Sequence, residues 1–394
     1  MFNGVKGLAQ RPPTHPAPHR GAASGRPVAV DDASFMAHAL ALAARGVNTT
    51  HPNPRVGCVV VAEGAVVGEG WHRVAGGDHA EIIALRQAGK RAAEATLYLT
   101  LEPCNHYGRT PPCTDAVVAA GIRRAVIALE DPNPRVDGGG VAALRRAGID
   151  VTVGVGAQSA HRLNRGFCQR MSTGRPWVTL KMAASLDGKT AMSNGESQWI
   201  TGQAARRDAH QLRAASSAIL TGVGTVLRDD PQMTARLDGI HRQPLRVILD
   251  SRLSTPPQAK ILHAPGAALI ITTDAGDSGP LRGTGVEVIT CGQHAGRLDL
   301  HRVMRELAER EVNDLLVEAG PRLSGNLLKQ RLVDQVVVYV SPDLLGSDAR
   351  GMFDIPGLER IKDRHRLAFG DVRRVGGDLR LTLDVVGGAV PARP

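Results

Sequence analysis

Two short stretches, HAE at residues 79–81 and PCNHYGRTPPC at residues 103–113, decide which chemistry and fold this sequence encodes. His79, Cys104 and Cys113 offer one imidazole and two thiols, a three-ligand set for tetrahedral zinc that leaves the fourth position open for water, as in catalytic sites. Glu81 is close to this set in sequence yet free to carry protons. A zinc-activated water beside a non-ligand glutamate is the machinery for hydrolytic deamination of a cytosine- or adenine-like ring.

The spacing of the two thiols departs from the usual deaminase pattern, which closes with P-C-x-x-C. Here eight residues separate Cys104 from Cys113, so the longer loop either breaks the site or marks a subfamily. Two alternatives remain open. One is a buried histidine with two unrelated cysteines. The other is a structural zinc site, for which His106 in the same loop is the candidate fourth ligand.

Composition narrows the class of protein. A chain of 394 residues is long enough for two domains. Aromatic residues make up only 3%, which argues against a protein that stacks single-stranded nucleic acid on aromatic platforms. No apolar run reaches the roughly 20 residues that span a membrane. A net charge of +10 with scattered arginines suits phosphorylated small molecules, and the odd count of 5 cysteines favours reduced thiols and a cytoplasmic location.

Proline-rich residues 1–30 lack a periodic apolar pattern and are expected to be a disordered extension. Residues 31–156 alternate strand and helix patterns and predict a three-layer α/β zinc deaminase domain with a largely parallel sheet. Helices are expected at 35–45, 79–88, 114–120 and 141–147, and strands at 56–61, 65–70, 96–100, 125–129 and 151–155. His79 and Cys113 would then lie at helix N-termini, whose partial positive charge favours thiolate.

Residues 157–176 are expected to connect this domain to a second α/β domain at 177–394. Its glycine-bearing segments TGVGT (221–225) and EAGPRLSGN (318–326) each follow a predicted strand, and such turns can cradle a phosphate on backbone N–H groups. A plain tight turn is the alternative, because neither segment is a full dinucleotide fingerprint. Expected strands are 177–183, 218–221, 245–249, 268–272, 315–318 and 335–340; expected helices are 203–213, 300–310 and 324–331, with a hairpin at 372–386.

Motifs in both halves resemble one family, the bifunctional deaminase–reductases of riboflavin biosynthesis. The first-half motifs are THPNPRVG (50–57), HAE, LEPC through GRTPPC (101–113) and DPNP (131–134). Those of the second half are ASLDGKTA (184–191), GESQWIT (195–201), DDP (229–231), VEAGP (317–321) and LLGSDARG (344–351). The resemblance spans about residues 33–385, and the long cysteine loop is that family's own form.

The resemblance implies a cytidine-deaminase-like domain followed by a dihydrofolate-reductase-like α/β domain, with zinc and NADPH as cofactors. Two reactions follow from it. The 2-amino group of 2,5-diamino-6-ribosylamino-4(3H)-pyrimidinone 5′-phosphate is hydrolysed, and NADPH then reduces the ribosyl group to ribityl. The expected partners are these phosphorylated pyrimidines, without nucleic acid or membrane, and a homo-oligomer built through the reductase domain is plausible for the family.

Site residues follow from the same resemblance, position by position. His79, Cys104 and Cys113 would hold zinc, with Glu81 as the catalytic proton shuttle. The remaining expectations are Asn53, His72, His106 and Arg109 for the deaminase substrate; Ala183, Trp199, Thr225, Asp229, Ser251, Gly320, Pro321, Arg322, Leu323, Ser324, Gly325 and Asn326 for NADPH; Ser197, Arg213, Met233, Arg236 and Glu318 for the reductase substrate; and Lys181 and Asp187 as guesses for the reduction.

Two rival functions remain at this stage. A nucleoside or tRNA deaminase with an accessory nucleotide-binding domain fits the positive net charge of the chain, although the motifs of the second half argue against it. A non-catalytic nucleotide-binding regulator with a structural zinc is the rival from another class.

Overall fold

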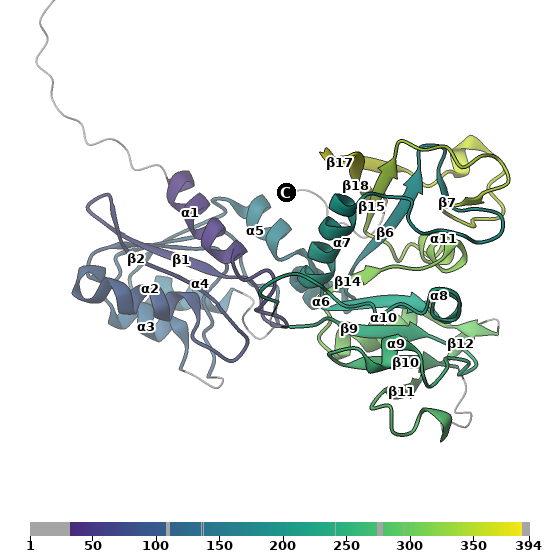
Figure 1. Ribbon diagram of the computed structural model, residues 1–394. Helices are drawn as coiled ribbons and strands as arrows, with labels where there is room; N and C mark the ends of the chain where they lie inside the picture. Colours follow the sequence, from purple (N-terminus) through teal and green to yellow (C-terminus); the bar gives the residue numbers. More distant parts are fainter. Residues whose placement is uncertain are drawn as a thin grey trace, which may run out of the picture. The chain divides into compact units, whose positions relative to one another are not determined.

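The computed structural model describes residues 32–107, 111–134, 136, 138–240, 242–273, 279–294 and 296–387 (Figure 1). The expected disordered extension at residues 1–30 lies outside these ranges. The elements of the first half are α1 (Asp32–Ala44), β1 (Gly57–Ala62), β2 (Ala65–Trp71), α2 (Ala80–Ala88), η1 (Gly89–Ala92), β3 (Thr96–Leu99), α3 (Cys113–Ala119), β4 (Arg124–Ile127), α4 (Gly139–Arg146) and β5 (Asp150–Val153).

Helices cover both faces of the five-stranded first sheet, whose order is β2-β1-β3-β4-β5. Successive side chains of β1 point to opposite faces. Val60 packs into the core under α2, whereas Val59 and Val61 pack with Met36 of α1. Figure 1 shows α2, α3 and α4 on one side of these strands and α1 on the other. The expected three-layer arrangement is therefore confirmed.

The expectation of a largely parallel first sheet is wrong in part. β1 pairs antiparallel with both β2 and β3, while the β3–β4 and β4–β5 pairs are parallel. The tight turn at Gly64, with φ of 78°, returns the chain directly into β2. A hairpin of this kind needs no crossover helix, so the first strands cannot run parallel.

Glycines in the hairpin bring α2 close to the sheet. A Cβ at Gly70 would lie 2.5 Å from the carbonyl oxygen of Ala80, and one at Gly68 would lie 2.2 Å from that of Ala84. Any larger residue would push the helix away. The N-terminus of α2, which carries the HAE motif, is thus set directly against the strands.

Two helices, α5 (Ala157–Leu163) and α6 (Arg165–Thr173), occupy the expected connector. The second half contains β6 (Trp177–Ser185), β7 (Lys189–Ala191), α7 (Gln203–Ala215), β8 (Ala218–Gly222), α8 (Val223–Asp229), β9 (Leu245–Leu249), α9 (Lys260–His263), β10 (Ala268–Thr272), η2 (Gly279–Leu281), β11 (Glu287–Thr290), β12 (Gln293–His294), β13 (Arg297–Leu298), α10 (Leu300–Glu309), β14 (Asp314–Val317), α11 (Pro321–Lys329), β15 (Gln335–Ser341), β16 (Arg350–Gly351), η3 (Ile361–Asp363), β17 (Leu367–Val375) and β18 (Asp378–Val385).

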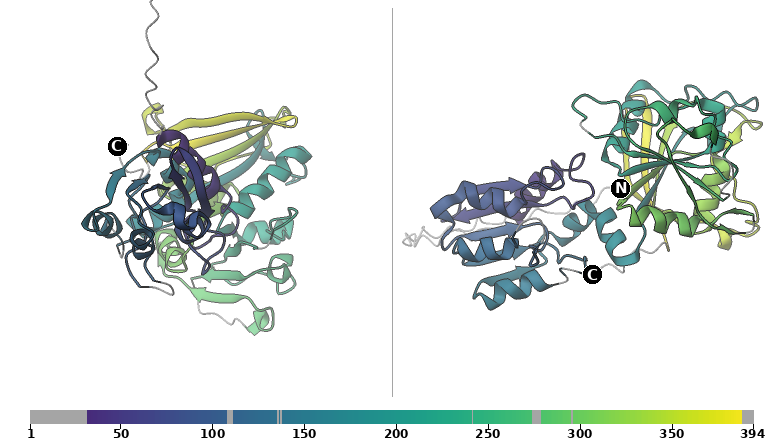
Figure 2. Two further views of the ribbon diagram at one scale, coloured as in Figure 1. Left: turned by 90° about the vertical axis from the view of Figure 1, so that its left-hand side faces the viewer. Right: turned by 90° about the horizontal axis from the view of Figure 1, so that it is seen from below.

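The second sheet has nine strands in the order β11-β10-β9-β8-β14-β6-β15-β18-β17. Every pair from β11 to β15 is parallel, and the C-terminal hairpin β17–β18 adds antiparallel to β15. α10 and α11 pack on one face, while α7, α8 and α9 pack on the other. Helices flank the strands of this sheet in Figure 2. Since parallel strands end at one edge, the loops after β8 and β14 lie side by side.

Candidate active sites

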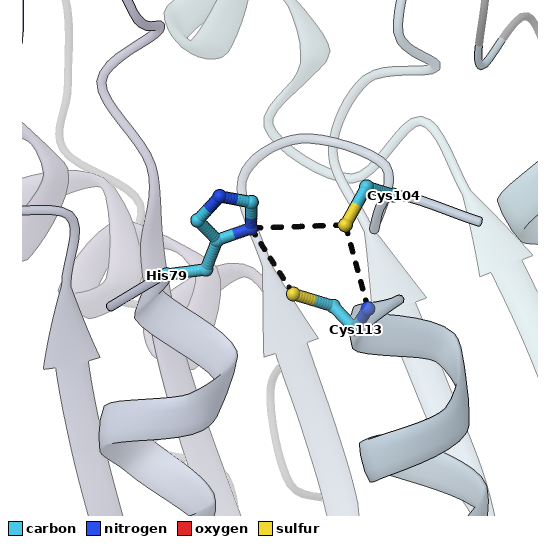
Figure 3. A group of neighbouring side chains, drawn as sticks. All are labelled: His79, Cys104 and Cys113. Atoms are coloured by element: carbon cyan, nitrogen blue, oxygen red, sulfur yellow. Dashed lines mark hydrogen bonds between the residues drawn. The ribbon is translucent and has the colours of Figure 1, made fainter. Parts of the chain in front are cut away.

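The three expected zinc ligands converge. His79 immediately precedes α2, Cys113 is the first residue of α3, and Cys104 lies in the loop after β3 (Figure 3). The His79 Nδ1 atom lies 3.1 Å from the Cys113 Sγ and 3.7 Å from the Cys104 Sγ. Tetrahedral zinc with ordinary bond lengths holds a nitrogen and a sulfur ligand about 3.5 Å apart. The donor set and its spacing therefore fit zinc.

Hydrogen bonding prepares one of the thiols for metal binding. The Cys113 thiol donates to Cys104, and together with His79 this lowers the pKa of the Cys104 thiol to about 4 despite partial burial. The same hydrogen bond raises the pKa of Cys113, and the contact with Cys104 raises that of His79. Both contacts favour the thiolate form of Cys104, which is the form that binds zinc.

Glu81 lies in the first turn of α2 beside the ligands but not among them. Its side chain is 3% exposed and interacts with Cys113, and burial raises the pKa of its carboxyl group while the neighbouring His79 opposes that rise. Among the described residues, the candidate metal cluster comprises His79, Cys104 and Cys113. A buried carboxyl group next to the metal ligands can exchange protons with a water there.

Two further expected residues join this centre. The Asn53 amide nitrogen lies 3.0 Å from the Nε2 atom of buried His72, whose Nδ1 lies 3.1 Å from the Asp78 carbonyl oxygen. The His72 ring meets that of His79 edge-on at 5.6 Å. His106 is exposed and lies outside the metal cluster. Arg109 lies outside the described residues.

Glu102, to which no sequence pattern assigned a role, supports the cysteine loop. Its carboxylate is 4% exposed and accepts backbone N–H groups from Asp131 at 3.0 Å, Gly138 at 3.0 Å and Val141 at 2.8 Å. Two of these donors belong to the N-terminus of α4, so Glu102 ties that helix to the segment that carries Cys104. The LEPC motif contained the residue, but its partners lie about thirty residues away along the chain.

We expect Glu102→Gln to weaken zinc binding about tenfold to a hundredfold, the usual cost of losing a residue that orients a metal ligand. In the variant, an amide NH2 group replaces one carboxylate oxygen. That oxygen accepts backbone N–H groups in the unsubstituted protein, whereas the NH2 group is itself a donor and cannot accept them. Competition with a chromophoric chelator measures the affinity. The exposed neighbour Glu130 offers a matched control, because Glu130→Gln removes the same charge without touching the loop. Equal zinc affinity in both variants would contradict the role of Glu102.

A second cluster forms where β6, α7 and β14 meet. Arg213 Nε and Nη2 donate to the two Glu318 oxygens at 2.6 and 2.9 Å, and Lys181 Nζ lies 3.6 Å from Glu318. Arg213 also contacts the Met233 sulfur at 3.8 Å. Burial raises the pKa of Glu318, but Arg213 and Lys181 outweigh it and hold the pKa at about 2. The site is a carboxylate, 11% exposed, that lies between two cations.

His210 also borders this cluster and was missed by the sequence analysis. It lies one turn before Arg213 on α7 and accepts the backbone N–H of Arg236 at 3.2 Å. Burial, with the nearby positive charges of Arg213 and Arg236, lowers the pKa of His210 to about 4. Its spacing of three residues from Arg213 on a predicted helix was the signal that could have found it.

Asp187 and Ser197 lie on other segments of the reductase half, whereas Arg236 adjoins this cluster beside His210. Asp187 is exposed, and its oxygens accept the Ser185 hydroxyl and the backbone N–H groups of Leu345 and Gly346, so it fastens the LLGSDARG loop. Ser197 lies half-buried in the loop before α7. Arg236 is exposed and reaches the Thr234 hydroxyl at 3.4 Å.

The predicted phosphate cradle corresponds to two helix N-termini. α8 follows β8 at Gly222 and α11 follows β14 at Gly320, and neither helix is capped by a side chain of the described residues. A Cβ at Gly224 or Gly320 would meet nothing within 4 Å, so neither glycine is crowded by the surrounding protein. The geometry fits a phosphate-bearing cofactor. Gly325 instead packs on the Asp354 carbonyl oxygen, 2.1 Å from a built Cβ.

The remaining cofactor expectations lie around the same sheet edge. Trp199 is 69% exposed beneath the guanidinium of Arg206, which lies 4.6 Å from the ring centroid. Thr225 and Asp229 lie on α8, Ser251 follows β9, Ala183 lies on β6, and Pro321 to Asn326 form the first turns of α11.

We expect Glu318→Gln to lower the free energy of unfolding by about 3 kcal/mol at pH 7, because it leaves the buried Arg213 without its counter-charge. The Glu318 pKa of about 2 is below the ordinary 4.5, so its contribution is complete above about pH 4.5 and is lost as pH falls toward 2. Chemical denaturation of both proteins at pH 7 and pH 3 measures this difference.

The control is Glu306→Gln, which breaks a partly exposed ion pair with Arg310 at 2.9 Å and is expected to cost less than about 1 kcal/mol. A Glu318 variant that is as stable as the Glu306 variant at pH 7 would contradict the prediction, and so would a difference that grows on acidification.

Known proteins match both halves of the chain. Residues 29–129 match the cytidine and deoxycytidylate deaminase zinc-binding region, and residues 176–381 match the RibD C-terminal domain. The riboflavin biosynthesis protein RibD of Escherichia coli K12 is 49% identical over 366 residues, covering 90% of this chain and 99% of that protein. RibD of Aquifex aeolicus is 43% identical over 350 residues, covering 88% of this chain and 97% of that protein.

Solved structures give the same result. Acinetobacter baumannii RibD (form 1) superposes with a TM-score of 0.84 at 44% identity, covering 90% of this chain and 99% of that one. A diaminohydroxyphosphoribosylaminopyrimidine deaminase/5-amino-6-(5-phosphoribosylamino)uracil reductase from Thermotoga maritima gives 0.81 at 34% identity, covering 90% and 98%. Within the described residues, no helix combines the length and apolar character needed to cross a membrane.

A zinc-binding deaminase region followed by a reductase of dihydrofolate-reductase-like fold defines the class as bifunctional deaminase–reductases, with zinc and NADPH as cofactors. The chain belongs to the RibD family of riboflavin biosynthesis. The nucleoside or tRNA deaminase alternative is not favoured by these matches.

Proposed function

We propose that this enzyme hydrolyses the 2-amino group of 2,5-diamino-6-ribosylamino-4(3H)-pyrimidinone 5′-phosphate and then reduces the ribosyl group of the product to ribityl. The single observation that carries the first step is the cluster His79–Cys104–Cys113 with the buried Glu81 at its side. The Thermotoga maritima relative carries both corresponding activities in its name. The second step is supported by the clamped Glu318 in the same chain.

In the deamination, His79, Cys104 and Cys113 would hold zinc, which supplies a water that is acidic enough to ionise near neutral pH. Glu81 takes the proton from the attacking water and passes it to the ring nitrogen. The new C–O bond leaves a hydroxyl group on the ring carbon, and Glu81 takes the remaining proton from that hydroxyl. Glu81 gives this second proton to the amino group, so that the carbonyl forms, the C–N bond breaks and ammonia leaves. Asn53 and His72 orient the pyrimidine, and His106 and Arg109 are proposed to complete its binding.

In the reduction, the N-termini of α8 and α11 would hold the phosphates of NADPH, which supplies the hydride. Arg213 and Arg236 are the proposed partners of the substrate phosphate, since a guanidinium forks onto two oxygens. Glu318, which accepts from Arg213, is proposed to contact the substrate outside its phosphate. Lys181, whose Nζ lies 3.6 Å from Glu318, is the proposed proton donor. The other proposed contacts are Ser197 and Met233 for the substrate and Ala183, Trp199, Thr225, Asp229 and Ser251 for the cofactor.

A coupled assay tests the proposal. The diaminopyrimidine substrate alone should release ammonia, and NADPH absorbance should fall only once deaminated product is present. Free nucleosides and a tRNA fragment serve as rival substrates. Ammonia release from these, or NADPH binding without oxidation, would favour the rival functions.

We also assign residues 31–156 to the deaminase domain, 157–176 to the connector and 177–394 to the reductase domain.

A homo-oligomer is part of the proposal, because the edge strand β17 is exposed along most of its length and carries Phe369, 71% exposed, and Val372, 53% exposed. Light scattering would show a mass of at least twice the chain mass. The five free thiols suit a cytoplasmic location.

A further inference from the structure

The loop that carries Asn53 is fastened to the reductase half of the chain. We propose that three residues of the reductase half, Ser217, Asn313 and Asp314, are positioning residues for deamination: they hold the loop 51–55 and so fix the Asn53 amide against the pyrimidine. The inference rests on the proposed contact between Asn53 and the substrate. It makes the reductase half a structural part of the first reaction.

The first fastening point is His51. The Ser217 hydroxyl oxygen accepts the backbone N–H groups of Asn313 and Asp314, both at 3.1 Å, and lies 3.0 Å from the His51 Nδ1 atom. A hydroxyl has two acceptor positions and one donor. With both acceptor positions filled, Ser217 donates to His51, which therefore accepts at Nδ1 and carries its proton on Nε2.

The next fastening points are Pro52 and Arg55. The Asn313 amide donates to the Pro52 carbonyl at 2.8 Å, while its oxygen accepts Arg170 Nε at 2.6 Å. Arg55 forms an ion pair with Asp314 at 3.0 Å, and both side chains are less than a fifth exposed. Partly buried, charge-assisted contacts of this kind hold geometry better than surface pairs.

Asn53 lies between these fastened residues. The His72 Nδ1 atom faces the Asp78 carbonyl, which can only accept, so Nδ1 carries the proton and Nε2 accepts from the Asn53 amide nitrogen. This fixes which end of the amide faces His72. The Asn53 Oδ1 atom is then directed elsewhere, as an acceptor for an N–H or amino group of the pyrimidine.

A double-mutant cycle tests the inference. Ser217→Ala and Asn313→Ala should each raise the KM of deamination about tenfold and change kcat less than about threefold, because orientation is lost and the proton shuttle is not. Combining either substitution with Asn53→Ala should cost no more than Asn53→Ala alone. NADPH oxidation with the deaminated substrate should stay within about twofold of the unsubstituted enzyme.

Ser216→Ala is the matched control. Ser216 is buried beside Ser217, but its hydroxyl donates to the Leu212 carbonyl of α7 at 2.7 Å and does not reach the loop. It should leave the deaminase KM unchanged. If Ser217→Ala does not fold, the cycle that combines Asn313→Ala with Asn53→Ala tests the same inference.

The outcomes separate the two claims. An unchanged KM in Asn53→Ala overturns the proposed substrate contact, and the positioning inference falls with it. A raised KM in Asn53→Ala, together with unchanged values in Ser217→Ala and Asn313→Ala, overturns the positioning inference only. The positioning inference is also overturned if the KM increases of the two single substitutions multiply in a double variant with Asn53→Ala.

Discussion

Glu81→Gln should lower kcat for ammonia release about a thousandfold while the protein retains its zinc. The amide has the shape of the carboxyl group and leaves His79, Cys104 and Cys113 in place, but it cannot take up the proton of the attacking water or pass it on. General acid–base groups contribute about a hundredfold to ten-thousandfold, and Glu81 is proposed to act at each proton transfer of the reaction. Its burial at 3% exposure means that solvent cannot substitute for it.

Three measurements on one preparation check this prediction: ammonia release, zinc content by atomic spectroscopy, and NADPH oxidation with the deaminated pyrimidine. The last two should match the unsubstituted enzyme. Wild-type rates of ammonia release would remove Glu81 from the mechanism. A simultaneous loss of zinc would show that Glu81 supports the metal instead of moving protons.

Sequence patterns could predict that His79, Cys104 and Cys113 come together because the spacing that brings them together is local. His79 and Glu81 are two residues apart at the start of one helix, and the two cysteines bracket one loop. Residues at such short spacing lie close together whatever the rest of the fold is. The principal strands of the second sheet were likewise predicted, since buried parallel strands are nearly continuous apolar runs.

Other elements could not be predicted because their patterns are short or weak. β11 consists only of exposed and half-buried residues, and α8 begins within the TGVGT segment, where a phosphate-binding turn was predicted and no helix. The antiparallel pairing of β1 with β3 depends on which strands come together, and hydrophobic alternation does not encode that choice.

Supporting residues were missed for a different reason: their partners are distant in sequence. Glu102 contacts backbone groups of residues 131–141, and Ser217 contacts His51 across 166 positions. In the sequence, nothing about the residue type distinguishes Glu102 or Ser217 from other glutamates and serines. Only the fold shows which segments of the deaminase half these two side chains contact.

Cys104→Ser should reduce bound zinc from about one ion per chain to less than about a tenth, and deamination should disappear with it. A serine hydroxyl stays protonated at neutral pH, whereas zinc binds the thiolate that hydrogen bonds from Cys113 and His79 create at Cys104. Two remaining protein ligands are fewer than zinc sites ordinarily have. The reductase reaction should persist, because its clamped Glu318 lies on other elements.

The control for the lost thiol is Cys168→Ser, a buried cysteine of α6 outside the metal cluster, which should keep its zinc. Stoichiometric zinc in Cys104→Ser would show that another donor completes the site. His106 is the imidazole on the same loop, so the double variant Cys104→Ser/His106→Ala would identify it. If that double variant loses the metal while Cys104→Ser alone keeps it, the centre has a four-donor set, and the open water position on which the proposed deamination depends is lost.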